Sequence, residues 1–138
     1  MNNNKPLYLA WFIAMTSMLG SLYFSEVMKL PPCILCWYQR ILMYPLVIII
    51  PVGILNIDKK VYKYVQSLSV VGIAIAFYHY LLYVKILPDT YAPCSTGVSC
   101  TTKLIEWFGF INIPFLSLVS FTLITCLMIY YSKQNKND

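Results

Sequence analysis

Four long runs of apolar residues divide the chain, at about residues 7–25, 41–57, 64–84 and 113–132. Runs of about 17 to 25 apolar residues are typical of membrane-spanning helices, because a helix rises about 1.5 Å per residue and the hydrocarbon layer is about 30 Å thick. The second run contains Pro45 and Pro51, which a membrane helix tolerates where neighbouring groups satisfy the freed carbonyls. The pattern predicts an all-α membrane protein, a bundle of four transmembrane helices.

The segments between these runs are short, and no repeat or low-complexity tract separates them. Residues 1–138 are therefore expected to form a single integral membrane domain. The first run follows Lys5 and could instead be a secretory signal peptide. Its length, and the lack of a small-residue cleavage motif after it, favour a membrane span.

Composition agrees with a lipid environment, since 59% of the residues are apolar and 11% are charged. About a quarter of the residues of an ordinary soluble domain are charged. The net charge of +5 would suggest nucleic acid as a partner for a soluble protein, but here the cations flank apolar runs. Membrane topology and anionic lipid explain them better.

Charge asymmetry predicts the orientation. Four spans put both termini and the loop 58–63 on one side, and the other two loops on the opposite side. The first side carries six Lys or Arg residues and the second carries four, namely Lys5, Lys59, Lys60, Lys63, Lys133 and Lys136 against Lys29, Arg40, Lys85 and Lys103. The positive-inside rule therefore predicts cytoplasmic termini and extracytoplasmic cysteine-bearing loops in a multi-pass protein of the plasma membrane.

Four cysteines fall in the two predicted outer loops. Cys33 and Cys36 form a C-x-x-C before the second run, and Cys94 and Cys100 lie between the third and fourth runs. Because disulfides persist outside the cytosol, the four thiols are expected to form or exchange disulfides. A structural zinc site and two static disulfides remain alternatives. Cys126 lies alone in the fourth run, where a small buried apolar side chain is expected.

The surroundings of the first pair favour redox chemistry. Pro31 and Pro32 precede it, so a helix can begin at or near Cys36, where the positive end of the helix dipole favours a thiolate. Arg40 follows by four residues and would share a helical face with Cys36, where it could meet the thiolate or an oxygen of a bound electron acceptor. The alternative for Arg40 is a side chain that extends to the membrane interface.

His79 is the single histidine of the chain and lies in the outer half of the third run. An ionisable group inside a membrane span suggests a proton donor or a ligand contact, although a hydrogen-bonded packing role is equally open. Residues 101–113 mix charged and aromatic side chains. This segment is expected either to lie in the membrane interface as a short helix or to extend the fourth span.

These residues together resemble the DsbB family. The resemblance rests on the string Cys33-Ile-Leu-Cys36-Trp-Tyr-Gln-Arg40, the lone His79, the pair Cys94 and Cys100, and Trp107-Phe108-Gly109-Phe110 before Ile113-Pro114-Phe115. It covers nearly the whole chain and is strongest with the small Gram-positive branch, the BdbC proteins.

The resemblance implies a quinone-dependent protein disulfide oxidoreductase. Such a protein reoxidises a secreted DsbA-like thiol oxidase of the thioredoxin fold, of the BdbD type in this branch, and passes the electrons to membrane quinone, here menaquinone. It implies that the partner attacks Cys94, that Cys100 exchanges with Cys33, and that Cys36 passes electrons to a quinone bound by Arg40 and His79.

Two other functions compete with this one. A structural or zinc-binding tetraspan protein would hold its cysteine pairs static and would bind stoichiometric zinc. A quinone reductase similar to vitamin K epoxide reductase is the other alternative, but that family places its C-x-x-C late in the bundle, whereas Cys33 and Cys36 precede the second span.

Overall fold

The computed structural model describes residues 4–92 and 112–137. Its elements are the helices α1 (Lys5–Glu26), α2 (Ile34–Leu55), α3 (Val61–Tyr83) and α4 (Ile113–Asn137), with a short 3-10 turn, η1 (Asp89–Tyr91), after α3. Each long helix is apolar and long enough to cross a membrane. The predicted bundle of four membrane helices is confirmed. The expected interfacial segment comprises residues 101–113, and of these the structure describes only residues 112 and 113.

The α2 helix begins at Ile34, whereas the apolar run predicts a span from residue 41. The difference arises because the first two turns of α2 contain Gln39 and Arg40, which interrupt the apolar pattern without interrupting the helix. The other three helices extend the predicted spans by a few residues at one or both ends. The dithiol motif therefore belongs to the start of a membrane helix.

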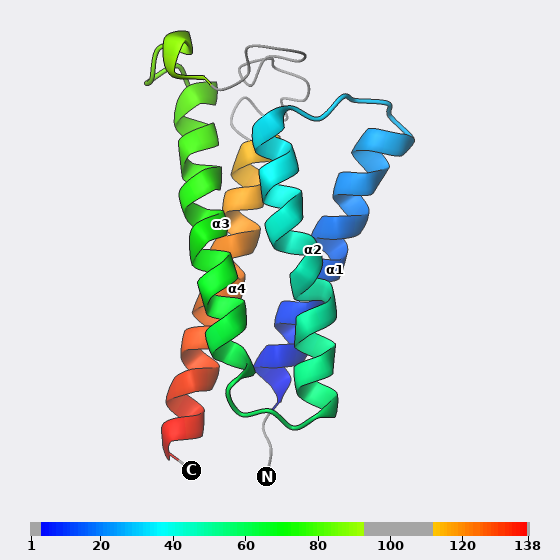
Figure 1. Ribbon diagram of the computed structural model, residues 1–138, viewed down its shortest axis with the longest axis vertical. Helices are drawn as coiled ribbons and strands as arrows, with labels where there is room; N and C mark the ends of the chain where they lie inside the picture. Colours follow the sequence, from blue (N-terminus) through cyan, green and yellow to red (C-terminus); the bar gives the residue numbers. More distant parts are fainter. Residues whose placement is uncertain (1–3, 93–111, 138) are drawn as a thin grey trace.

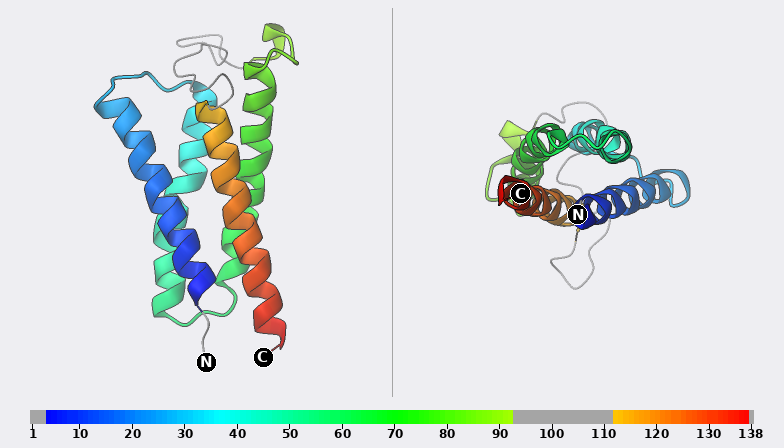
Figure 2. Two further views of the ribbon diagram at one scale, coloured as in Figure 1. Left: turned by 180° about the vertical axis from the view of Figure 1, so that it is seen from behind. Right: turned by 90° about the horizontal axis from the view of Figure 1, so that it is seen from below.

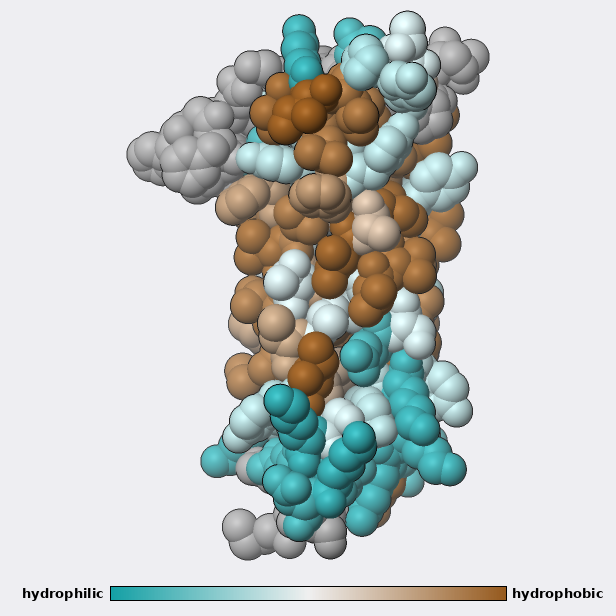
Figure 3. Space-filling view, turned by 90° about the vertical axis from the view of Figure 1, so that its left-hand side faces the viewer, coloured by the Kyte–Doolittle hydropathy of each residue, from teal (hydrophilic) through white to brown (hydrophobic). Residues whose placement is uncertain are grey.

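The four helices form a ring in which neighbours in the chain are neighbours in space. Helix α3 packs against α2 and α4, and α1 packs against the same two helices from the other side. Both termini lie at one end of the bundle, and α2 begins at the opposite end (Figure 1). Towards that opposite end α1 leans away from the other helices (Figure 2). One face of the molecule shows an apolar band with hydrophilic residues gathered mostly at the end that carries the termini (Figure 3).

The tightest packing lies in the half of the bundle near the termini. Its fully buried side chains come from all four helices: Leu7, Ala10 and Ala14, Leu46 and Ile50, Val61 and Val65, and Ile124 and Met128. The ring of Phe121 lies against Gly72, where an added Cβ would come within 2.4 Å of it. This close approach of α3 and α4 lies near the middle of the bundle, and α1 diverges towards the end that carries the dithiol.

A hydrogen bond between helices compensates for one of the prolines in α2. Pro51 has no N–H, so the carbonyl of Val47, four residues earlier, loses its partner within the helix. The indole Nε1–H of Trp11 in α1 donates to that carbonyl at 3.1 Å. The expectation that a neighbouring helix satisfies a carbonyl freed by proline is met here.

Cys126 is exposed on the surface of α4. The expectation that it is buried was wrong. In a membrane bundle the outward faces are as apolar as the core, because lipid tails and leucine side chains are chemically alike. An apolar run therefore identifies a span but does not distinguish its buried face from its lipid-facing face.

Replacement of Trp11 should lower the stability of the protein, because the carbonyl of Val47 that Pro51 leaves free then has no donor. Trp11→Phe removes the N–H donor to Val47 and should lower the free energy of unfolding by about 1 kcal/mol, as is usual for hydrogen bonds between membrane helices. Pro51→Ala restores a backbone donor to the same carbonyl, so Trp11→Phe should cost less in that background. Thermal unfolding of the four proteins in one detergent measures the cycle, and equal costs in both backgrounds would contradict this account.

Candidate functional site

The C-x-x-C motif occupies the first turn of α2. Cys33 is the residue before the helix, in extended conformation at φ −75° and ψ 171°, and Cys36 is the third helical residue. The first-turn N–H groups of a helix carry partial positive charge, which stabilises sulfur anions nearby. Pro31 and Pro32 lead into this start, so the helix begins at Ile34, slightly before the position expected from the sequence.

The two sulfur atoms of the motif lie 3.2 Å apart as a hydrogen-bonded dithiol. Cys33 is buried and Cys36 is half-buried. A disulfide bond is about 2.05 Å long, so a shift of about 1 Å converts the dithiol geometry into a bonded one. The two cysteines are therefore placed so that a disulfide bond between them can form and break.

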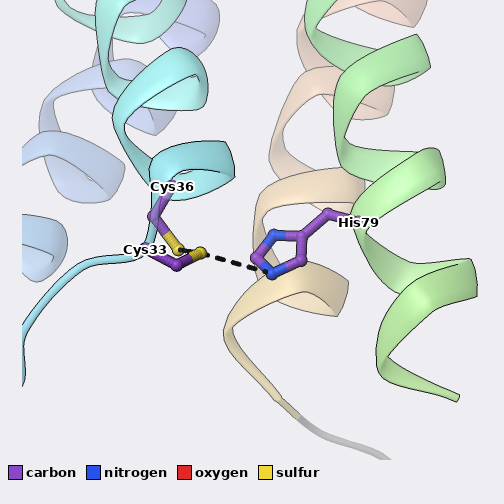
Figure 4. Close-up of side chains that lie close together, drawn as sticks. All are labelled: Cys33, Cys36 and His79. Atoms are coloured by element: carbon purple, nitrogen blue, oxygen red, sulfur yellow. Dashed lines mark hydrogen bonds between the residues drawn. The ribbon is translucent and has the colours of Figure 1, made fainter. Parts of the chain in front are cut away.

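The buried side of the pair faces α3 (Figure 4). Nε2 of His79 lies 3.7 Å from Sγ of Cys33, and Nδ1 of His79 lies 3.0 Å from the amide nitrogen of Gln39. Gln39 and His79 are only 6% and 3% exposed. The structure thus brings His79 to Cys33, and His79 is not among the residues that line the cavity described below.

Cys33 is the more acidic thiol of the reduced pair. The hydrogen bond with Cys36, together with the contact to His79, lowers the pKa of the Cys33 thiol to about 4, although burial opposes this shift. The sequence pattern favours an anion on Cys36 instead. In the dithiol described here the contacts favour the anion on Cys33 rather than on Cys36, because Cys33 is the sulfur that lies beside His79.

A cavity of about 280 Å³ opens on the other side of the pair, between α1, α2 and α4. Its lining includes Cys36, Arg40 and Tyr44, which are spaced four residues apart along one face of α2. The divergence of α1 from the bundle makes room for it, and at Gly20 an added Cβ would meet no atom within 4 Å. Cavities that bind small molecules start at about this size.

Two serines of α1 hold Arg40 at the cavity. Its Nε donates to Oγ of Ser21 at 2.8 Å, and its Nη2 donates to the carbonyl of Ser21 at 3.0 Å and to Oγ of Ser25. The guanidinium also lies 5.5 Å from the ring centroid of Trp37, within the range of a cation–π contact. Among the described residues Nη1 has no hydrogen-bond partner, so this nitrogen remains able to donate to a ligand.

Three side chains of the candidate site were missed in the sequence, namely Ser21, Ser25 and Gln39. Ser21 and Ser25 are separated by one helical turn on α1, and this i, i+4 spacing of hydroxyls in an apolar run was the available signal. For Gln39 the available signal was an uncharged polar residue next to Arg40 at the start of the span. Uncharged polar residues inside spans are expected to find partners on other helices, which is what these three do.

The cavity also contains an unpaired polar atom. Tyr44 lines it, and within the described part of the chain the hydroxyl oxygen of Tyr44 is buried without a hydrogen-bond partner. Buried polar atoms without partners are uncommon in folded proteins. A guanidinium with a free N–H, a phenol and apolar walls fit a ligand that is largely apolar and carries carbonyl oxygens, as a quinone does.

The dithiol and His79 also form a set of donors that could hold a metal ion. The two sulfur atoms and a ring nitrogen of His79 all lie within 4.8 Å of one another. Two thiolates and an imidazole are suitable ligands for zinc. The zinc alternative considered for the sequence required all four loop cysteines, and Cys94 and Cys100 lie outside the described residues.

Comparison with known proteins bears on the whole chain. The model of the DsbB family, disulfide bond formation protein DsbB, matches residues 3–131. The chain is 49% identical over 122 residues to disulfide bond formation protein C of Bacillus subtilis, with 88% of each chain covered. It is 47% identical over 116 residues to the probable disulfide formation protein C of Halalkalibacterium halodurans, covering 83% of this chain and 84% of that one. No solved structure matches the chain.

The lowered pKa of Cys33 predicts how the reactivity of this thiol depends on pH. Cys33 should be alkylated by iodoacetamide at nearly the same rate between roughly pH 6 and 8, because its thiolate is already formed, and the rate should fall as the pH drops through about 4. Glutathione is a suitable reference, since an ordinary thiol with a pKa of about 8.5 gains almost tenfold in reactivity per pH unit below it. Mass spectrometry of the Cys33 peptide measures the rate, and a rise parallel to that of glutathione would contradict the assignment.

Proposed function

Because the chain belongs to the DsbB family of disulfide bond formation proteins, we propose that Cys33 and Cys36 deliver its electrons to a quinone in the cavity beside Arg40. The protein is a multi-pass membrane oxidoreductase that reoxidises a DsbA-type partner and passes the electrons to quinone. The observation that carries the site proposal is that Cys36 lines the cavity, while its partner sulfur is buried beside His79.

We infer that the relay begins at Cys94 and Cys100, as in the family. A thiolate of the reduced partner attacks Cys94, and Cys100 leaves as a thiolate that attacks Cys33 and releases Cys36. The second thiol of the partner then closes the partner's own disulfide and frees Cys94, which re-forms its bond with Cys100 and releases Cys33. Each exchange breaks one disulfide and forms one, so the two electrons end on Cys33 and Cys36 as the dithiol described above.

A bound quinone supplies the final acceptor, since its reduction to hydroquinone takes up two electrons and two protons. The role of the chain is to bring the donor and the acceptor together. Cys36 opens onto the cavity, and Arg40 can donate from Nη1 to an oxygen that gains negative charge. The serine contacts fix the guanidinium before a ligand binds, which reduces the ordering that binding requires.

We propose menaquinone as the physiological quinone and a BdbD-type thioredoxin-fold protein as the partner. The support is the likeness to proteins of Gram-positive bacteria, to which the BdbC branch belongs. The excess of Lys and Arg at the end with the termini further supports cytoplasmic termini, with the dithiol end of the bundle facing outwards. A single membrane domain over residues 1–138 remains our expectation.

Metal binding is a second candidate function, favoured by the cluster of Cys33, Cys36 and His79. A zinc ion bound there would keep both sulfurs as thiolates and would block disulfide formation. The two functions differ in what the purified protein contains. Stoichiometric zinc together with thiols that quinone does not oxidise would support the metal site over electron transfer.

Loss of the cavity sulfur should abolish electron transfer. The variant Cys36→Ser, purified as the full chain and supplied with reduced DsbA-type partner and a soluble menaquinone analogue, should reduce quinone no faster than background, because the Cys33–Cys36 disulfide cannot re-form. Quinone absorbance measures the rate. Cys126→Ser is the matched control, since Cys126 is exposed on α4, and it should retain the full rate. Unchanged turnover by Cys36→Ser would refute the assignment.

Filling the cavity should weaken quinone binding selectively. Gly20 lines the cavity and has open space at its Cβ position, so Gly20→Leu places a side chain where the ligand would lie. The KM for quinone should rise about tenfold, equivalent to about 1.4 kcal/mol, while the KM for the partner stays the same. Gly20→Ala is the control and should be nearly silent. A Leu variant with both KM values unchanged would place the quinone elsewhere.

A further inference from the structure

Gln39 connects the two sides of the candidate site. It lines the cavity together with Cys36 and Arg40, and its amide nitrogen contacts Nδ1 of His79 at 3.0 Å. The other ring nitrogen, Nε2, faces Sγ of Cys33 at 3.7 Å, a distance suited to the longer hydrogen bonds of sulfur. These contacts align Gln39, His79 and Cys33 in one buried chain of hydrogen bonds.

We propose that Gln39 is a positioning residue whose amide N–H donates to Nδ1 of His79 and so leaves the ring proton on Nε2, directed at the sulfur of Cys33. A neutral imidazole has one donor and one acceptor nitrogen, and the hydrogen bond at one of them determines which nitrogen keeps the proton. With a donor at Nδ1, only Nε2 can carry the hydrogen. The His79 ring is thereby a donor to Cys33.

The other tautomer of His79, with the proton on Nδ1, would not stabilise a thiolate at Cys33. If the Gln39 carbonyl faced an Nδ1–H group, Nε2 would present a lone pair to the sulfur and would disfavour the thiolate. The lowered pKa of Cys33 agrees with a donor at this position, since the hydrogen bond with His79 is among its causes after that with Cys36. The buried position of Gln39 and His79 protects this arrangement from water, which would otherwise compete for both ring nitrogens.

The consequence for the reaction rests on the proposed function. Cys33 must leave as a thiolate when Cys94 attacks the bond between Cys33 and Cys100. A sulfur whose anion is stabilised departs faster in thiol–disulfide exchange. Nε2–H of His79 stabilises that anion on the α3 side. His79 thus acts on the exchange step, and Arg40 acts on the quinone.

The single histidine of the chain makes the proton directly observable. Nitrogen NMR of the reduced full chain, labelled with ¹⁵N-histidine in lipid nanodiscs, distinguishes a protonated from an unprotonated ring nitrogen. We expect a proton on Nε2 and a hydrogen-bonded, unprotonated Nδ1. A proton on Nδ1 in the unmodified protein would overturn the proposal without the need for any variant.

Two variants of nearly equal length identify Gln39 as the cause. Gln39→Met removes the donor, so the Nδ1 resonance should move to the position of a nitrogen without a hydrogen bond. Gln39→Glu offers only acceptors when its carboxyl is ionised, and should then bring a proton to Nδ1. An Nδ1 resonance that does not move in Gln39→Met, or an ionised Gln39→Glu variant with Nδ1 still unprotonated, would overturn the proposal.

A double-mutant cycle on thiol reactivity then tests whether Gln39 acts through His79. Alkylation of Cys33 in the reduced protein should slow about fivefold in His79→Leu, the usual effect of one lost hydrogen bond, and by a smaller factor in Gln39→Met. The two variants combined should react as His79→Leu alone, whereas independent, multiplicative effects would contradict positioning. Neither measurement uses quinone or partner, so a failure here is distinct from a failure of the Cys36→Ser test.

Discussion

In lipid no water is available to polar groups, so they depend on partners within the protein or in a bound ligand. This constraint explains the contacts that hold the helices in place: Trp11 satisfies the carbonyl that Pro51 leaves free, Ser21 and Ser25 hold Arg40, and Gln39 meets His79. Each contact joins two different helices. The polar residues of the spans therefore determine the rotation of α1 and α3 about α2, which apolar packing alone specifies weakly.

The bundle divides into two halves with different tasks. Near the termini, large side chains fill the interior and Val61 packs directly on Gly53. At the other end α1 diverges, and the contacts of Arg40 with two serines bridge α1 and α2 in place of apolar packing. A cavity can exist there because the tightly packed half keeps the four helices together.

The spans could be predicted from the sequence because their length and lack of charge are local properties. The start of α2 at Ile34 was less predictable, since Gln39 and Arg40 interrupt the apolar run although they are helical. Spacing correctly indicated that Arg40 and Cys36 share a face, but the partners of a side chain on other helices depend on helix rotation, which no local pattern contains. For this reason Ser21, Ser25 and the approach of His79 to Cys33 were missed, and the burial of Cys126 was predicted wrongly.

Placement of the two sulfurs on different sides of α2 separates two kinds of chemistry. Exchange with another thiol requires a sulfur that is stable as an anion and leaves readily, which the α3 side provides at Cys33. The proposed electron transfer to quinone requires a sulfur in contact with an apolar cavity and a fixed cation, and on the α1 side Cys36 lines such a cavity together with Arg40. Because the sulfurs are only 3.2 Å apart, closing one bond between them connects the two sides without any large movement of the helices.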